Sequence, residues 1–244
     1  PYLGIDYTKN TKKNLVKMEH YNLFWHILLR GDFMQRINTN TVVVLNATEL
    51  KSALENTTDT TIFLGADITL TTGIKINAAK TKVIIDGTYE NTMHTLTDKR
   101  STAAGDTITI AANTTKSIIV QNINVTGYNY YGIIYIPEAS AYSDVTVTYS
   151  NLTYVGPQIS FHPNGLTEFI NCNITIQENY AASNEVAECN KIAIGGVTSI
   201  NHKSTANSAF WFRNTNPSLT ILAGATVNFT SPSREVIYGP TNLA

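Results

Sequence analysis

The sequence predicts an all-β protein built as a parallel β-helix, and two observations within residues 143–176 carry that prediction. Three runs rich in Thr and apolar residues are separated by Gly156-Pro157 and by the turn signal HPNG at 162–165, so no run exceeds roughly the usual length of a strand. The last run also repeats the first, because NLTY at 151–154 aligns with NITI at 173–176 at an offset of 22. An offset in the low twenties corresponds to one coil of a parallel β-helix.

The composition supports a soluble chain with many strands and turns. Charged residues make up 14% of the 244 residues, compared with about 25% in an average globular protein. Thr (35 residues) and Asn (26 residues) take their place, and these types suit strand faces and tight turns respectively. The formal net charge of −1, without a basic cluster, argues against nucleic-acid binding.

Two features at the chain level concern localisation. No run approaches eighteen apolar residues, so we expect no membrane insertion within this sequence. The chain begins with Pro1 rather than Met, which leads us to expect a fragment of a longer protein whose signal peptide and anchor lie outside it.

Residues 1–40 differ from the rest and are predicted to form an N-terminal helical flanking segment. Leu15, Met18, Trp25 and Leu28 fall at near-helical spacing, and Gly31 is a plausible end for that helix. The basic residues of this segment are most simply a solvated face, and a helix lying on a membrane surface is the alternative interpretation.

Residues 41–60 are predicted to form a strand followed by a short amphipathic helix. Asn46 can cap the amino end of this helix with Glu49 at the third helical position, and Leu50, Ala53 and Leu54 make one apolar stripe. Placed before a stack of β-coils, such a helix can cover the open edge of the stack. We therefore expect an N-terminal helical cap in one domain with the coils.

Residues 61–244 are predicted to form the β-helix itself. Consecutive coils can be placed at Ile62, Val83, Ile118, Val145 and Thr167, which gives steps of 21, 35, 27 and 22 residues. A basic coil of about 22 residues is then lengthened by loops at 89–105 and 128–143. An antiparallel sandwich is the competing architecture, but it predicts hairpin dipeptides between strands, and the only Asn-Gly is at 164–165.

Several segments resemble a known family. These are VVVLNATELKSALENTTDTTIFLGADITL, then VIIDG, then VTYSNLTYVGPQISFHPNGLTEF. Together they resemble the pectate-lyase-like adhesive domain of Firmicutes cell-surface proteins over roughly residues 41–235, whereas residues 1–40 match it poorly.

The resemblance implies a single-stranded right-handed parallel β-helix in a secreted protein attached to the surface or cell wall of a Gram-positive bacterium. Adhesion is the implied role, with a host protein, a matrix protein or a glycan as partner. We expect a monomer that needs no cofactor. A purely structural stalk or spacer is a further possibility.

A Ca²⁺-dependent polysaccharide lyase is the enzymatic alternative, because several parallel β-helices cleave polysaccharides. Such a site needs clustered carboxylates to hold Ca²⁺ and an Arg or Lys to take a proton. The candidates on consecutive coils are isolated in the sequence: Asp86, Asp106, Asp144 and Glu168, with Arg100 or Arg213 as the base. The paired carboxylates of a hydrolase are absent as well, so we expect no catalytic residues.

A cluster of tyrosines is the best candidate for ligand binding. Rings on a rigid scaffold offer sugars and proteins a flat, partly apolar surface with hydroxyl groups. Some of the tyrosines, including the nearby Tyr149 and Tyr154, could instead pack between coils. The predicted ligand-binding residues are Tyr128, Tyr130, Tyr131, Tyr135 and Tyr142.

The two cysteines, Cys172 and Cys189, fit no spacing of metal ligands. Free, partly buried thiols are favoured over a disulfide, and no metal site is expected.

Overall fold

The computed structural model describes residues 34–178, 184–232 and 235–240. The account below concerns the unit formed by residues 34–244. The helix expected between residues 14 and 31 lies outside the described residues. Residues 35–38, which the sequence assigned to the flanking segment, form strand β1 (Gln35–Asn38) and pair antiparallel with β2 (Thr41–Val44).

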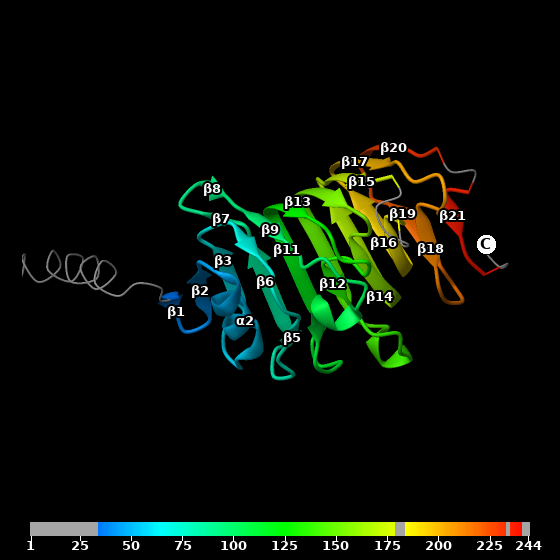
Figure 1. Ribbon diagram of the computed structural model, residues 1–244. Coiled ribbons are helices and arrows are strands. Elements are labelled where there is room, and N and C mark those ends of the chain that lie inside the picture. The colour runs from blue at the N-terminus through cyan, green and yellow to red at the C-terminus, as the bar shows by residue number, and fades with distance from the viewer. Residues whose placement is uncertain (1–33, 179–183, 233–234, 241–244) are drawn as a thin grey trace, which may run out of the picture. The chain divides into compact units, whose positions relative to one another are not determined.

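This unit is an all-β fold in which successive strands stack in parallel, as expected of a parallel β-helix (Figure 1). Among the described strands, pairing is antiparallel only between β1 and β2 and in the small hairpin of β7 (Thr88–Tyr89) and β8 (Thr92–Met93). An antiparallel sandwich is thereby excluded.

The strands form three ladders that run the length of the stack. The first ladder contains β2, β3 (Thr61–Leu64), β6 (Lys82–Asp86), the first halves of β11 (Ser117–Thr126) and β13 (Thr146–Gly156), the second halves of β14 (Ser160–Ile170) and β16 (Ala187–Gly195), and β19 (Ser218–Ile221).

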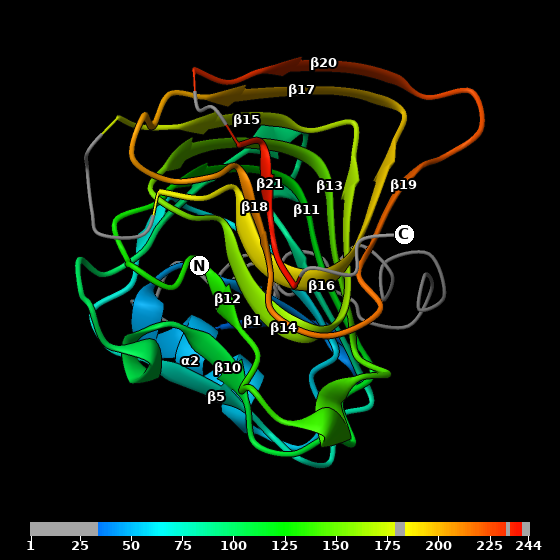
Figure 2. The ribbon, with the colours of Figure 1, turned by 90° about the vertical axis from the view of Figure 1, so that its right-hand side faces the viewer.

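The second ladder contains β4 (Ile68–Thr69), β9 (Thr95–Thr97), the second halves of β11 and β13, β15 (Asn173–Ile176), β17 (Val197–His202) and β20 (Thr226–Thr230). The third ladder contains β5 (Ile74–Ile76), β10 (Ile108–Ile110), β12 (Ile134–Tyr135), the first parts of β14 and β16, β18 (Phe210–Phe212) and β21 (Ile237–Tyr238). Figure 2 looks along this stack, with β15, β17 and β20 together on one side and β18 and β21 on another.

The corner between the first and second ladders is made by residues in the left-handed backbone region. Asn122, Asn151 and Asn171 have φ values of 51°, 48° and 54°, and Gly196 follows in the next coil with φ 58°. Asn tolerates this region better than other residues with a Cβ atom. Asn151 Nδ2 donates to Asn122 Oδ1 at 3.0 Å, and Asn122 Nδ2 donates to Asp86 Oδ2 at 3.0 Å. The corner is therefore held by a column of side-chain hydrogen bonds.

The offset of 22 between NLTY and NITI is wrong by two residues. Thr153 pairs with Asn173 and Tyr154 with Ile174, which is an offset of 20. The partner of Asn151 at the corner is Asn171, because Ser150 pairs with Ile170. Residues 171 and 173 are both Asn, and only the backbone conformation distinguishes the corner residue from the strand residue.

The coil steps are corrected in the same way. Along the first ladder, Ile62 pairs with Ile85, a step of 23 rather than 21, whereas the step of 35 from Val83 to Ile118 is confirmed. Ile118 pairs with Val147 and Val147 with Thr167, so the expected steps of 27 and 22 are 29 and 20. Each error equals two residues, because a shift of two keeps the same side chains on the same face of a strand.

The two predicted loops and the predicted HPNG turn also differ from expectation. Residues 89–105 contribute β9 to the second ladder and begin the short 3₁₀ helix η1 (Ala104–Asp106), and residues 128–143 contribute β12 and the 3₁₀ helix η2 (Ser140–Tyr142). HPNG lies inside β14, where the register shifts between His162 and Leu166. His162 is fully buried there, and burial lowers its pKa to about 4.

The core consists of Val, Ile and Leu side chains that alternate inward along each ladder. Tyr149 and Tyr154 belong to it, since both are fully buried, and the ring of Tyr149 stacks on that of Phe169 at 5.6 Å. These two tyrosines therefore pack between coils. Cys172 and Cys189 are free and buried, as favoured from the sequence.

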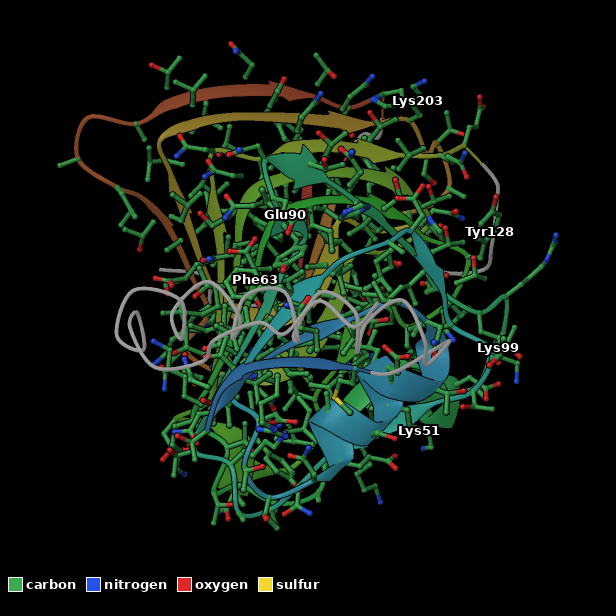
Figure 3. All side chains as sticks on the ribbon, turned by 90° about the vertical axis from the view of Figure 1, so that its left-hand side faces the viewer. Lys51, Phe63, Glu90, Lys99, Tyr128 and Lys203 are labelled. Atoms are coloured by element: carbon green, nitrogen blue, oxygen red, sulfur yellow. The ribbon has the colours of Figure 1, made fainter. Side chains whose placement is uncertain are left out.

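The predicted amphipathic helix is α2 (Ala47–Glu55), and Asn46 is confirmed as the residue that caps its amino end. Asn46 Oδ1 accepts from Glu49 N at 3.0 Å, and Glu49 Oε2 accepts from Leu45 N at 2.8 Å. Leu50 and Leu54 are fully buried, and the helix contacts β2 and β5. Figure 3 shows α2, which carries Lys51, at the near end of the stack. Its role in covering the coil edge stays a prediction.

Candidate functional site

Aromatic side chains follow one another in register on the outer side of the third ladder. Tyr135 pairs with Phe161, Phe161 with Glu188, Glu188 with Trp211, and Trp211 with Tyr238. Residues paired in parallel strands lie about one strand spacing apart and point to the same side of the sheet. Five consecutive coils therefore present a column of four aromatic rings with one carboxylate in its middle.

The rings contact each other within this column. Tyr135 stacks on Phe161 with ring centroids 4.9 Å apart, and Tyr131 meets both rings edge-on at 5.2 and 5.4 Å. Trp211 and Tyr238 meet edge-on at 5.6 Å. We call this set the aromatic face: Tyr131, Tyr135, Phe161, Trp211 and Tyr238.

Arg213 occupies the gap that Glu188 leaves in the column. Its guanidinium carbon lies 4.7 Å from the centroid of Trp211 and 5.9 Å from that of Phe161. The two guanidinium nitrogens donate to Glu188 Oε2 at 2.9 Å and to Glu138 Oε2 at 3.1 Å. Arg213 thus continues the flat surface across the coil that has no ring.

Burial governs the protonation of the two acids near Arg213. Glu188 has a side chain only 4% exposed, and burial, with the neighbouring charge of Glu185, raises its pKa to about 7. Burial also raises the pKa of Glu185. Arg213 lowers both values without offsetting the burial. Burial therefore favours the protonated, neutral form of both acids.

A cleft opens at the Trp211 end of the aromatic face. It has a volume of about 230 Å³. Its lining includes Glu185, Asn207, Ser208, Trp211, Glu235 and Tyr238. Tyr238 is 52% exposed, so this end of the face is open to solvent.

The predicted tyrosines occupy three different settings. Tyr131 and Tyr135 lie in the aromatic face, and Tyr130 contacts Tyr131 edge-on at 4.9 Å. Tyr142 belongs to η2 and is partly buried against the core. Tyr128 is 36% exposed, and its backbone nitrogen donates to Asp98 Oδ1. Figure 3 shows Tyr128 at the same margin of the stack as Lys99.

The carboxylates considered for a lyase are engaged separately. Asp86 accepts from Thr88 N and from the side chains of Gln121 and Asn122 at the corner. The other three each have a different partner: Asp106 with Lys99, Asp144 with Lys116, and Glu168 with the hydroxyl of Thr148. Within the described residues, no group of three or more His, Cys, Asp or Glu converges to hold a metal.

Sequence reasoning missed most of the aromatic face and its acids. The missed residues come from separate coils and lie far from one another in the sequence: Phe161, Glu188, Trp211 and Tyr238. The sequence indicates Arg213 only as a possible catalytic base of the lyase alternative. The available signal was the alternation within the run SAFWF, where Phe210 and Phe212 point inward and Trp211 points outward. The run QISF gave no such signal, because Ile159 is in the core and Phe161, two residues later, is not part of it.

Comparisons with known proteins agree with the fold. Residues 41–161 match the family described as "Putative pectate lyase-like adhesive domain", which confirms the resemblance over that range. Among curated proteins, no sequence matches this chain. A solved structure of a Lactobacillus reuteri serine-rich repeat protein superposes with a TM-score of 0.64 at 20% identity, covering 84% of this chain. This chain covers 66% of that one, slightly less than two thirds of its length.

Proposed function

We propose that this chain is a non-catalytic module of a bacterial cell-surface adhesin, which binds a host, matrix or glycan ligand on the aromatic face. The family match over residues 41–161 and the likeness to a surface protein support an adhesive role outside the cell. Among the described residues, no helix is long and apolar enough to cross a membrane.

The observation that carries the proposal is the register of the aromatic face. Tyr135 and Phe161 are 4.9 Å apart, and Trp211 and Tyr238 are 5.6 Å apart, so neighbouring rings are spaced by about one coil. Phe161 is only 5% exposed and its ring stacks on that of Tyr135, so a ligand would contact the accessible parts of the other four rings. Such rings suit sugars or an extended peptide. Tyr130 extends the face on one side, and we include Tyr128 and Tyr142 as contributors at its margin.

The fold part of the proposal is the right-handed, capped β-helix of the family. Parallel strands joined by a crossover are right-handed in about 98% of known cases. The buried stripe of α2 against β2 and β5 supports its role as the cap.

A screen of glycans and matrix proteins with wild-type and variant chains tests the proposal. We expect Trp211→Ala and Tyr238→Ala each to weaken binding about tenfold, equivalent to about 1.4 kcal/mol. Tyr89→Ala is the matched control, because Tyr89 contacts Phe63 and Gln35 on another part of the stack.

Three outcomes separate the alternatives. Equal loss in the Tyr89 variant would point to a general effect of removing a ring. Unsaturated products from a uronate polymer with Ca²⁺ would favour the lyase. Absence of any ligand and any product would favour a structural spacer. Thermal melting of each variant confirms that it is folded.

A further inference from the structure

The cleft beside Trp211 contains a buried carboxylate oxygen that lacks a hydrogen-bond partner. Glu185 is only 3% exposed and lines the cleft. Its Oε1 accepts from Asn207 Nδ2 at 2.8 Å, whereas its Oε2 has no partner among the described residues. Buried carboxylate oxygens are normally satisfied, and an unsatisfied one is costly. A donor from a ligand in the cleft would remove this deficit once side-chain movement in the lining uncovers Oε2, which is shielded from solvent in this structure.

The charges around Glu185 favour a cationic donor. Among the described residues, Arg213 is the cation of this group, and it already binds Glu188 and Glu138. Its charge also acts on Glu185 without a hydrogen bond between them, so one guanidinium serves three carboxylates. Burial is the main cause of the raised pKa of Glu188, and the charge of Glu185 raises it further despite the attraction of Arg213. An added positive charge would be stabilised here, and an added carboxylate would be repelled.

The walls of the cleft suit the same kind of group. Trp211 and Tyr238 both line the cleft, and their rings contact each other edge-on. Aromatic rings attract cations within about 6 Å of their centroids. An ammonium group has three donors and fits a carboxylate oxygen as a compact charge. The volume of about 230 Å³ is too small for a bulky ligand but large enough for one sugar unit or one side chain.

We propose that this cleft recognises a primary ammonium group of the ligand through Glu185, at the end of the aromatic face. This inference rests on the proposed function, since it names the chemistry of the ligand that the aromatic face holds. A primary ammonium occurs in lysine side chains and in glucosamine units. It distinguishes the expected ligand from the polyuronates that a pectate lyase would bind.

Paired probes that differ only in acetylation test the proposal. The glycan pair is the tetramer of glucosamine and the tetramer of N-acetylglucosamine. The peptide pair is a short lysine peptide and its ε-acetylated form. We expect at least one ammonium probe to bind at least about tenfold more tightly than its acetylated partner, the range of a charge-assisted hydrogen bond. A galacturonate tetramer should bind more weakly than the glucosamine tetramer.

Glu185→Gln should abolish this preference for the ammonium probe. Gln keeps an acceptor for Asn207 and removes the charge, so the fold should be retained, which a thermal melt checks. Asp67→Asn is the control: Asp67 has a side chain 74% exposed and accepts from Thr95 N, so its removal changes net charge equally without touching the cleft. This variant should keep the full preference.

The results separate this inference from the proposed function. If binding is weakened by Trp211→Ala but is the same for acetylated and free probes and is unchanged in Glu185→Gln, the ammonium site is contradicted and the proposed binding on the aromatic face is still supported. A preference that survives in Glu185→Gln, or is lost equally in Asp67→Asn, also overturns it. A preference confined to the glycan pair or to the peptide pair supports it and identifies the source of the ammonium.

Discussion

Replacing Asn171 by Ala should destabilise the fold clearly more than replacing Asn173 by Ala. Asn171 lies at the corner with φ 54°, and its Oδ1 accepts from Val197 N at 2.9 Å. Asn173 lies in the extended strand β15 with its side chain exposed. The two substitutions are chemically identical and lie two residues apart, so they test the corrected offset of 20 directly.

The magnitude follows from two contributions. Ala in the left-handed region is less favourable than Asn by about 1 kcal/mol, and the lost hydrogen bond is worth about 0.5–1 kcal/mol at an exposed position. We therefore expect Asn171→Ala to lower the free energy of unfolding by about 1.5–2 kcal/mol. For a chain of this size, that corresponds to a fall of about 3–8 °C in Tm. Asn173→Ala should change it by at most about 0.5 kcal/mol.

Glycine substitutions separate the backbone contribution from the hydrogen bond. Asn171→Gly loses the side-chain bond but relieves the backbone, so it should be about 1 kcal/mol less destabilising than Asn171→Ala. The order should reverse at Thr153, an exposed strand residue of β13, where Gly should be worse than Ala by about 0.5–1 kcal/mol. Urea unfolding, followed by circular dichroism, measures all five variants.

Two results would refute the reasoning. If Asn173→Ala were as damaging as Asn171→Ala, the corner would not be where the backbone places it. If Asn171→Gly were worse than Asn171→Ala, the left-handed conformation would not govern this position.

Three further predictions concern buried titratable groups. Burial raises the pKa of Asp98 to about 7, so the folded state keeps a proton that the unfolded state releases near pH 4; the free energy of unfolding should fall as pH rises from about 4 to about 7. Urea midpoints at about pH 5 and about pH 8 should show a smaller fall in Asp98→Asn, and an unchanged fall would contradict the assignment. Arg213→Met should lower the free energy of unfolding by about 2 kcal/mol. This is less than the roughly 3–5 kcal/mol lost when one partner of a fully buried ion pair is removed, because Glu188 can take up a proton. In a double-mutant cycle, adding Glu188→Gln should restore part of the lost stability, and strictly additive effects would show that the two residues are not coupled. Burial raises the pKa of Cys172 to about 12 and that of Cys189 well above its usual value, so a thiol reagent should label neither in the native protein and both in denaturant; rapid native labelling would show that one is accessible.

Much of the fold could be predicted because local chemistry and periodicity agree in this chain. The cap of α2 was predictable, since Asn46 and Glu49 satisfy backbone donors next to them in the sequence. The step of 35 residues from Val83 to Ile118 was predictable because similar runs of Val and Ile flank it. The exact register between neighbouring coils was not predictable, because a slip of two residues keeps the same pattern of inward-pointing side chains.

The candidate site was predictable only where its residues are close in the sequence. Tyr131 and Tyr135 were found because the tyrosines around them crowd into one stretch. Phe161, Glu188 and Trp211 join them through pairing across coils of unequal length, so their spacing follows no fixed period. Glu185 carries no sequence signal, because its importance comes from burial beside Arg213.

The sequence by itself indicated the class of the fold, since recurring runs that align with one another, and the scarcity of hairpin dipeptides, favour stacked coils over an antiparallel sandwich. It also determined the helix at the amino end of that stack. The tertiary structure alone decided which Asn turns the corner, which tyrosines are buried and which acids share Arg213. Those outcomes depend on backbone conformation and on contacts between coils, and neither is encoded in the order of residues within a single coil.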